Sequence, residues 1–287
     1  MRDPSVNLLP RISVVCPTYN SAEFVLDTLA TIVAQSLPPA ELVVSDDGST
    51  DDTVDKIARF LSNSPHNFPY RLLRNPHRGV SATRNAGIMA ASEEWIAFLD
   101  SDDLWVPSKL LRVSEVIQRY PEVNFVYHNQ ERCTPDGQVG LFDHQAKYHP
   151  NIPLIDQLFK MNIFATSAIT CKKEILIQGG LFNSKYVCSE DYDLWIRMSP
   201  YIKLYAMKEV LGCYITRKEN LTCTNLERTM INDILIKTAH KDMVSTSLYF
   251  CGILVAVTHY LFEKLGIRRF PIIDRCIKKS ADILRKL

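Results

Sequence analysis

The chain has 287 residues, of which 46% are hydrophobic and 23% charged, a composition typical of a globular protein with a sizeable core. The formal net charge is +1, which gives no electrostatic reason to expect a nucleic-acid partner. The eight cysteines contain no C-x-x-C motif and no zinc-like pairing with histidine. Several lie inside apolar runs and are expected to be small core residues, and we expect a reducing, cytoplasmic compartment. No long apolar stretch opens the chain, and we expect no secretory signal.

Strand and helix patterns alternate over the first hundred residues. Short apolar runs that predict strands lie at 12–16, 42–45, 70–73 and 95–99. Patterns that predict helices lie between them, at 21–35, from Thr50 onward with Ser49 as the cap, and at 80–91. This alternation is typical of an α/β fold with a mostly parallel sheet flanked by helices.

The pattern is less regular after Asp103. We expect helices at 107–120 and 189–198, a short helix that ends at Gly179-Gly180, and a loop or hairpin at 129–150. Further strands are predicted at 124–128, 163–171 and 211–216. The chain is helical in character from Asn225 to its end. We therefore divide it into a catalytic domain, residues 1–224, and a C-terminal helical extension, residues 225–287.

Three carboxylates follow the strand predicted at 95–99. Asp100, Asp102 and Asp103 lie at the carboxyl end of this strand, where α/β sheets bind ligands. Because like charges this close repel one another, we expect an opposing charge nearby. A divalent cation with a bound diphosphate would supply it. The alternative is a plain acidic turn before the helix that begins near Pro107.

A second acidic segment, 46–51, follows the strand at 42–45. A carboxylate there can accept the N–H of a uracil ring or a ribose hydroxyl, and Gly48 allows a close backbone turn. The alternative is a helix-capping turn with incidental acids. The chain lacks G-x-G-x-x-G and G-x-x-x-x-G-K-[ST], which argues against a dinucleotide-binding Rossmann site and against a P-loop.

Three other segments carry candidate chemistry. The turn 17–20 can present backbone groups and a tyrosine ring to a nucleotide, or it is an ordinary strand–helix turn. Arg84, in a run of small residues, is a fixed cation for a phosphate or an acid, or else a surface arginine. Glu190 and Asp191 open the helix at 189–198, where a carboxylate can take a proton from an alcohol. Alternatively, both acids only favour the helix dipole.

Together and in this order, these segments resemble glycosyltransferase family 2, whose members have the GT-A fold. The segments are Pro17-Thr18-Tyr19-Asn20, Asp46-Asp47-Gly48-Ser49-Thr50-Asp51, Ser81-Ala82-Thr83-Arg84-Asn85-Ala86-Gly87, Phe98-Leu99-Asp100-Ser101-Asp102-Asp103, Gly179-Gly180-Leu181-Phe182 and Glu190-Asp191-Tyr192-Asp193-Leu194-Trp195. The resemblance extends from about Arg11 to about Thr222 and implies a GT-A fold with a C-terminal helical extension.

The resemblance also implies a nucleotide sugar bound over the carboxyl ends of the first strands. The donor-binding residues that it implies are Pro17, Thr18, Tyr19, Asp47, Arg84, Asp100, Ser101, Glu190 and Arg217. In this set, Asp47 contacts the base and Asp100 faces the ribose or the metal. Asp102 holds Mn²⁺ or Mg²⁺ on the diphosphate. Asp191 matches the catalytic base, which deprotonates the acceptor hydroxyl in an inverting, in-line displacement.

The sequence departs from the family pattern in two places. Family members often carry a histidine after the late strand, where this chain has Arg217, and arginine can pair with a diphosphate but cannot ligate a metal. No Q-x-x-R-W motif follows Glu190-Asp191, and that motif marks polymerising relatives. The chain is therefore predicted to transfer a single sugar.

The predicted reaction moves a hexosyl or N-acetylhexosaminyl group from a nucleotide sugar, by default UDP-linked, to a hydroxyl of a glycan or lipid-linked glycan. One alternative is a catalytically silent GT-A module that binds a nucleotide sugar or a partner. Another is a haloacid-dehalogenase-type phosphatase, because residues 99–104 nearly fit its D-x-D-x-[TV] motif. Against it, Leu104 replaces the Thr or Val and the motif lies far from the N-terminus.

The C-terminal extension predicts a surface contact. Residues 243–262 contain no Asp, Glu, Lys or Arg, and residues 263–287 hold eight lysines and arginines against three acids. We expect a peripheral attachment to the cytoplasmic face of a membrane. A helix buried on the catalytic domain and an oligomer contact are the alternatives, and five polar residues within 243–262 argue against a spanning helix.

Overall fold

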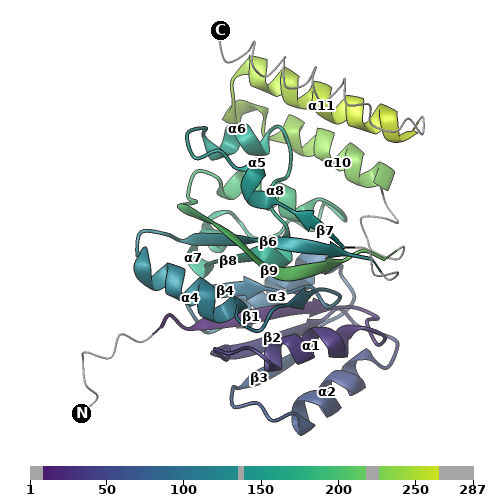
Figure 1. Ribbon diagram of the computed structural model, residues 1–287. Coiled ribbons are helices and arrows are strands. Elements are labelled where there is room, and N and C mark those ends of the chain that lie inside the picture. Colours follow the sequence, from purple (N-terminus) through teal and green to yellow (C-terminus); the bar gives the residue numbers. More distant parts are fainter. Residues whose placement is uncertain (1–8, 135–138, 218–225, 265–287) are drawn as a thin grey trace.

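The computed structural model describes residues 9–134, 139–217 and 226–264. Within these ranges a mixed sheet of nine strands runs through the molecule, with helices on both of its faces (Figure 1). The strand order is β3-β2-β1-β4-β8-β6-β9-β5, and β7 pairs with β6.

The first half of the sheet is parallel and agrees with the predicted alternation. Its strands are β1 (Ile12–Thr18), β2 (Glu41–Asp46), β3 (Tyr70–Arg74) and β4 (Trp95–Phe98). The connecting helices are α1 (Val25–Val33), α2 (Thr53–Asn63) and α3 (Val80–Ala90). Parallel strands need crossover connections of this kind, and as a result the carboxyl ends of β1, β2 and β4 meet at one edge.

The second half of the sheet is mixed. Its strands are β5 (Leu104–Trp105), β6 (Phe125–Cys133), β7 (Val139–Phe142), β8 (Ile169–Lys172) and β9 (Leu204–Ile215). Strand β8 lies antiparallel between β4 and β6, whereas β6 and β9 are parallel. The parallel arrangement expected for most of the sheet therefore holds from β3 to β4. The segment 129–150 contains the β6–β7 hairpin, one of the two forms predicted for it.

The remaining helices pack around the second half. They are α4 (Lys109–Arg119), α5 (His144–Lys147), α6 (Leu154–Leu158), α7 (Lys173–Gln178), α8 (Glu190–Met198), α10 (Leu226–Ala239) and α11 (Thr246–Lys264), with short 3-10 turns η1 (Thr166–Ala168) and η2 (Lys241–Met243). Because η1 takes 166–168, the strand predicted at 163–171 begins only at Ile169. Figure 1 shows α10 and α11 as the outermost layer at one end of the molecule.

The sheet separates two apolar cores, because successive side chains of a strand point to opposite faces. One face packs against α1, α2 and α4, through residues such as Val14, Leu29 and Val113. The other face packs against α3, α7, α8 and α10 around the fully buried Trp195. The residue Ile236 of α10 belongs to this second core, so α10 is packed onto the rest of the molecule.

Two local features differ from what the sequence pattern predicts. Helix α2 begins at Thr53 with Asp52 at its N-cap position, and Ser49 instead donates its hydroxyl to Asp46 Oδ1 at 2.5 Å. Cys133 and Cys213 form a disulfide, a pairing that the sequence pattern did not predict. The two cysteines lie 80 positions apart in the sequence, and the pairing of β6 with β9 brings them together.

Two other expectations concern the C-terminal part. No helix among the described residues combines the length and the apolar character that crossing a bilayer requires. The boundary proposed at 224/225 and the basic residues from Arg268 onward lie outside the described residues.

Candidate functional site

The site is built where the loops after β1, β2 and β4 meet. The Asp47 N–H donates to Thr18 O at 2.9 Å and joins the first two loops. The Ser21 and Ser101 hydroxyls lie 2.9 Å apart and join the first loop to the acidic segment after β4. Pro17 and Thr18 are buried in β1, while Tyr19 is exposed at its end. The segments that the sequence singled out therefore lie together.

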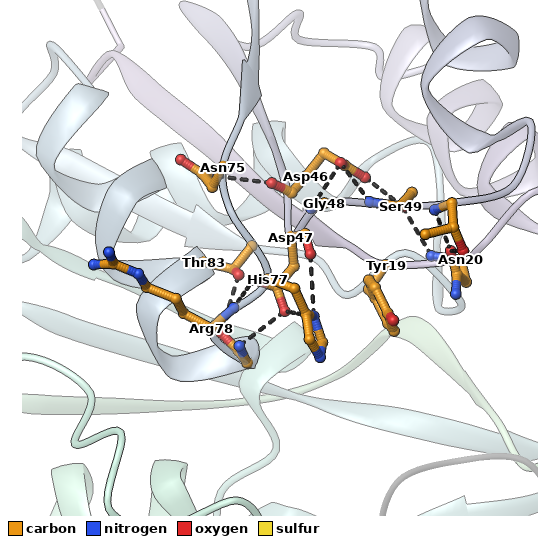
Figure 2. A network of polar contacts seen from close by, with 12 residues as sticks. Tyr19, Asn20, Asp46, Asp47, Gly48, Ser49, Asn75, His77, Arg78 and Thr83 are labelled. Atoms are coloured by element: carbon orange, nitrogen blue, oxygen red, sulfur yellow. Dashed lines mark hydrogen bonds and ion pairs between the residues drawn. The ribbon is translucent and has the colours of Figure 1, made fainter.

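Asp47 is held between the loop after β2 and the start of α3. Its Oδ1 accepts the Arg78 N–H at 2.9 Å, and its Oδ2 accepts the Gly79 N–H at 2.9 Å (Figure 2). Gly79 has a φ of 87° at the N-cap of α3, a conformation that glycine adopts without strain. Asp47 is therefore buried and oriented, whereas Tyr19 beside it presents an exposed ring.

His77 completes this part of the site. Its ring stacks on Tyr19 with the centroids 4.3 Å apart, and its Nδ1 lies 2.9 Å from Asp47 Oδ2. His77 was not predicted as a site residue, because it lies outside every segment of the family pattern. The β3–α3 loop brings it beside Tyr19, which is 58 positions earlier, and no local pattern signals such a contact.

Arg84 is the centre of the acidic part of the site. Its Nη1 donates to Glu190 Oε1 at 2.5 Å, and its Nη2 donates to both oxygens of Asp100 at 2.7 and 2.9 Å. The arginine is only 5% exposed, so the alternative of a surface arginine is wrong. One guanidinium thus joins α3, the end of β4 and the start of α8.

The other two acids after β4 have different surroundings. Asp103 is buried and accepts the Ile215 N–H at 3.1 Å, which ties the acidic loop to the end of β9. Asp102 is partly exposed, and its Oδ2 lies 3.7 Å from Nη1 of Arg217. Arg217 also donates to the backbone oxygen of Asp102 at 3.2 Å. Arg217 therefore lies beside the acidic loop.

Three carboxylates of the site, those of Asp102, Glu190 and Asp191, have raised pKa values. Burial, reinforced by the charge of Asp100, raises the pKa of Asp102 to about 6, with Arg217 opposing the shift. Burial raises the pKa of Glu190 to about 7 even though Arg84 favours its charged form. Burial also raises the pKa of Asp191. The negative charge of this region is thus only partly balanced by the two arginines.

The carboxylates of the acidic loop fit a hard divalent cation that is held mainly by one of them. No three Asp, Glu, His or Cys side chains among the described residues are gathered in a cage for a metal. Asp100 is engaged by Arg84, whereas Asp102 has exposed carboxylate surface and a pKa raised partly by a like charge. Mg²⁺ characteristically binds one or two carboxylates together with phosphate oxygens and water. Asp102 is therefore the residue here that fits such a cation.

Asp191 lies in the first turn of α8. Its Oδ1 accepts the N–H of Tyr192 at 2.7 Å, and its Oδ2 accepts the side-chain amide of Asn162 at 3.3 Å. Asn162 is a second residue that the sequence analysis did not identify. The preceding Ser189 has a φ of 62°, so the backbone makes a sharp turn immediately before the two acids. Asp191 remains partly exposed beside the Arg84 cluster.

Helix α10 supports the start of α8. The Asn232 side chain donates to Cys188 O at 2.8 Å, and the Ser189 hydroxyl donates to Asp233 Oδ1 at 2.8 Å. One turn further along α8, Asp193 lies 2.9 Å from Nε2 of His240. The C-terminal extension therefore positions the helix that carries Glu190 and Asp191, a role that its sequence did not indicate.

Comparison with known proteins identifies the family. Residues 13–175, more than half of the chain, match the family Glycosyl transferase family 2. The chain belongs to glycosyltransferase family 2. Its sheet flanked by helices resembles GT-A structures, so the predicted fold is confirmed and the protein is a glycosyltransferase.

Two relatives illustrate the similarity in sequence. The chain is 29% identical over 189 residues to the Escherichia coli UDP-Glc:α-D-GlcNAc-diphosphoundecaprenol β-1,3-glucosyltransferase WfgD, a match that covers 64% of this chain and 68% of that protein. It is 26% identical over 222 residues to an uncharacterised glycosyltransferase of Haemophilus influenzae, with 76% and 73% covered.

Two solved structures share the fold. Staphylococcus aureus TarS 1–349 in complex with UDP-GlcNAc has a TM-score of 0.65 at 16% identity, with 90% of this chain and 74% of that chain covered. The mannosyltransferase PcManGT from Pyrobaculum calidifontis, in complex with GDP-Man and Mn²⁺, has a TM-score of 0.64 at 19% identity, with 98% and 82% covered.

The raised pKa of Glu190 predicts how stability depends on pH. Between its ordinary pKa of 4.5 and its folded value of about 7, the folded state binds more protons than the unfolded state. The contribution of Glu190 to the free energy of unfolding is therefore largest below pH 4.5 and is lost as the pH rises through 7. The free energy of unfolding, measured with denaturant across this pH range, should therefore fall more steeply with pH for the wild type than for Glu190→Gln. Glu122→Gln, at an exposed glutamate before β6, should decline like the wild type, and parallel curves for all three proteins would contradict the assignment.

Proposed function

We propose that the protein transfers one hexosyl or N-acetylhexosaminyl group from a UDP-linked sugar to a hydroxyl of a lipid-linked glycan, with inversion and without processive extension. The observation that carries the proposal is the contact of Arg84 with Asp100 and Glu190. It brings the acidic loop after β4 and the acids at the start of α8 together where the carboxyl ends of the parallel strands meet. This is the edge where α/β sheets bind nucleotides.

The donor is proposed to lie across the loops after β1, β2 and β4. Tyr19 and Asp47 would contact the base, with Pro17 and Thr18 forming the floor beside them. Asp100 and Ser101 would face the ribose. The buried position of Asp47 and the exposed ring of Tyr19 support this assignment, because a base needs both an acceptor for its N–H and an apolar face.

The diphosphate is proposed to lie near Asp102 and Arg217. A divalent cation, Mn²⁺ or Mg²⁺, held by Asp102 would supply positive charge to the leaving diphosphate. Arg217 offers a guanidinium of fixed charge at the same place. Arg84 holds Asp100 and Glu190 in position, so that both carboxylates keep their orientation when the donor binds.

Asp191 is proposed as the base that takes the proton of the acceptor hydroxyl. Asp191 is a partly exposed residue, and its pKa, raised by burial, favours proton uptake from an alcohol. The hydrogen bonds from the Tyr192 N–H and from Asn162 fix the direction of the carboxylate. Glu190, which is buried and paired with Arg84, would order the start of the helix on the donor side.

The choice of substrates rests on the relatives. The name of WfgD gives UDP-glucose as the donor and a diphosphoundecaprenol-linked sugar as the acceptor, and TarS is in complex with UDP-GlcNAc. These names support a UDP-linked donor and a lipid-linked acceptor here. The alternative is a silent module that binds the donor without turnover, although the carboxylates at 100, 102 and 191 are all present. The phosphatase alternative is wrong, because the chain belongs to glycosyltransferase family 2.

Replacement of the proposed base tests the proposal. Asp191→Asn should lower the rate of sugar transfer by about 10²–10⁴, the usual contribution of a positioned general base, because the amide cannot accept the proton. Donor affinity, measured by calorimetry with UDP, should stay as in the wild type. Asp55→Asn, at an exposed acid in the first turn of α2, is the matched control and should leave transfer unchanged. Transfer by Asp191→Asn at the wild-type rate would contradict the role of the base.

We also propose that the C-terminal helices attach the protein to the cytoplasmic face of an anionic membrane. Large apolar side chains are exposed on both helices, namely Ile231, Leu235, Phe250, Leu254 and Leu261. The Tyr260 hydroxyl donates to Glu227, and the Thr238 and Tyr249 hydroxyls lie 3.5 Å apart. Helix α10, which carries the exposed Ile231 and Leu235, therefore lies beside α11. The sequence that follows, 265–287, holds seven lysines and arginines against two aspartates. Apolar burial together with basic residues is the usual basis of peripheral attachment to anionic lipid.

Flotation with phosphatidylglycerol vesicles at low salt tests this attachment. The full chain should float, and the double variant Phe250→Ser with Leu254→Ser should stay at the bottom, because it loses two apolar side chains that are more than 60% exposed. The control is Met89→Ser with Ile177→Ser, which removes two exposed apolar side chains elsewhere and should float. A wild-type chain that stays at the bottom would contradict the proposal. Dimers in sedimentation that the Phe250 and Leu254 changes dissociate would make the surface an oligomer contact instead.

A further inference from the structure

His77 makes the contacts that a nucleobase would make at the same place. Its Nδ1 lies 2.9 Å from Asp47 Oδ2 and 3.1 Å from Asp47 O (Figure 2). Because both neighbours are hydrogen-bond acceptors, Nδ1 carries the proton and donates. The flat face of the imidazole ring stacks on Tyr19 at an interplanar angle of 22°. A planar ring with an N–H donor thus lies against the exposed tyrosine and the buried carboxylate.

The carboxylate of Asp47 has little room for a second ring donor. Its side chain is 4% exposed, and its two oxygens already accept the N–H groups of Arg78 and Gly79. The His77 imidazole occupies a further approach to Oδ2. A base whose ring N–H donates to Asp47 and whose face lies on Tyr19 therefore needs the position of the imidazole.

The His77 side chain is held by few contacts and can be displaced by a ligand. Its side chain is 58% exposed, and its described contacts are those with Tyr19 and Asp47. A hydrogen bond from a ring that is 58% exposed and one ring stack are each modest interactions. Displacement therefore costs little and exposes no buried group other than the Asp47 oxygen, which the base then covers.

We infer that His77 is an internal stand-in for the nucleobase: in the free protein its imidazole occupies the base subsite. The base of the donor then displaces the imidazole from Tyr19 and Asp47. This inference rests on the proposed function, because it takes Tyr19 and Asp47 as the base subsite. His77 thereby sets the affinity for the donor: part of the binding free energy replaces contacts that the protein already makes with its own side chain. A ligand without a base does not compete with His77.

Calorimetry with UDP in the presence of Mn²⁺ tests the inference. His77→Ala should bind UDP about fivefold more tightly than the wild type, which corresponds to about 1 kcal/mol. Its affinity for inorganic pyrophosphate with Mn²⁺ should be unchanged, because pyrophosphate does not enter the base subsite. His149→Ala, at an exposed histidine whose described side-chain-mediated contacts are with Gln157, is the matched control and should bind both ligands like the wild type.

The other outcomes separate this inference from the function on which it rests. UDP affinity that falls or stays unchanged in His77→Ala overturns the stand-in, and a fall would make His77 a partner of the base. Tyr19→Ala provides the separation, because the proposed base subsite predicts weaker UDP binding for it whatever His77 does. If Tyr19→Ala binds UDP like the wild type, or if UDP binds no more tightly than pyrophosphate, the base subsite is wrong and the stand-in fails with it.

Discussion

The site depends on one buried guanidinium. Arg84 binds Asp100, at the end of β4, and also Glu190, which lies 106 positions after it at the start of α8. A buried charge without its partner destabilises a protein strongly, so the three groups need one another. This contact joins the acidic loop directly to the helix turn that carries the proposed base.

The surrounding fold holds Arg84 where the acids need it. A side chain at Gly87 would bring its Cβ within 2.5 Å of Val15 Cγ1, so α3 can lie this close to β1 only with glycine at that position. On the opposite side, α10 holds the start of α8 through Asn232 and Asp233. The same outer helices expose the apolar side chains proposed to meet the membrane. If that proposal holds, the surface that meets a lipid-linked acceptor and the support of the proposed base belong to one structural unit.

The parts of the fold that were predicted from sequence are those set by local patterns. The strands of the parallel half and the acids at their carboxyl ends follow from apolar runs that end in Asp46 and Asp100, and the family order of the motifs made the site recognisable. Pairings between distant segments left no such signal. The contacts of His77 with Tyr19, of Asn162 with Asp191 and of Cys133 with Cys213 join positions 58, 29 and 80 apart. They exist only because loops and strands are brought together by the sheet. The antiparallel insertion of β8 likewise depends on which neighbour the strand finds rather than on its own residues.

The central claim is that the acidic loop ordered by Arg84 binds a nucleoside diphosphate through a cation at Asp102. Calorimetric titration of UDP into the full chain, with and without Mn²⁺, measures this directly when it is repeated on Asp102→Asn. The account predicts that Mn²⁺ strengthens UDP binding in the wild type and that Asp102→Asn, still folded by circular dichroism, loses this strengthening, because removal of a ligand charge weakens a hard-cation site. Equal Mn²⁺ dependence in the two proteins, or UDP binding that ignores Mn²⁺ in both, would contradict it.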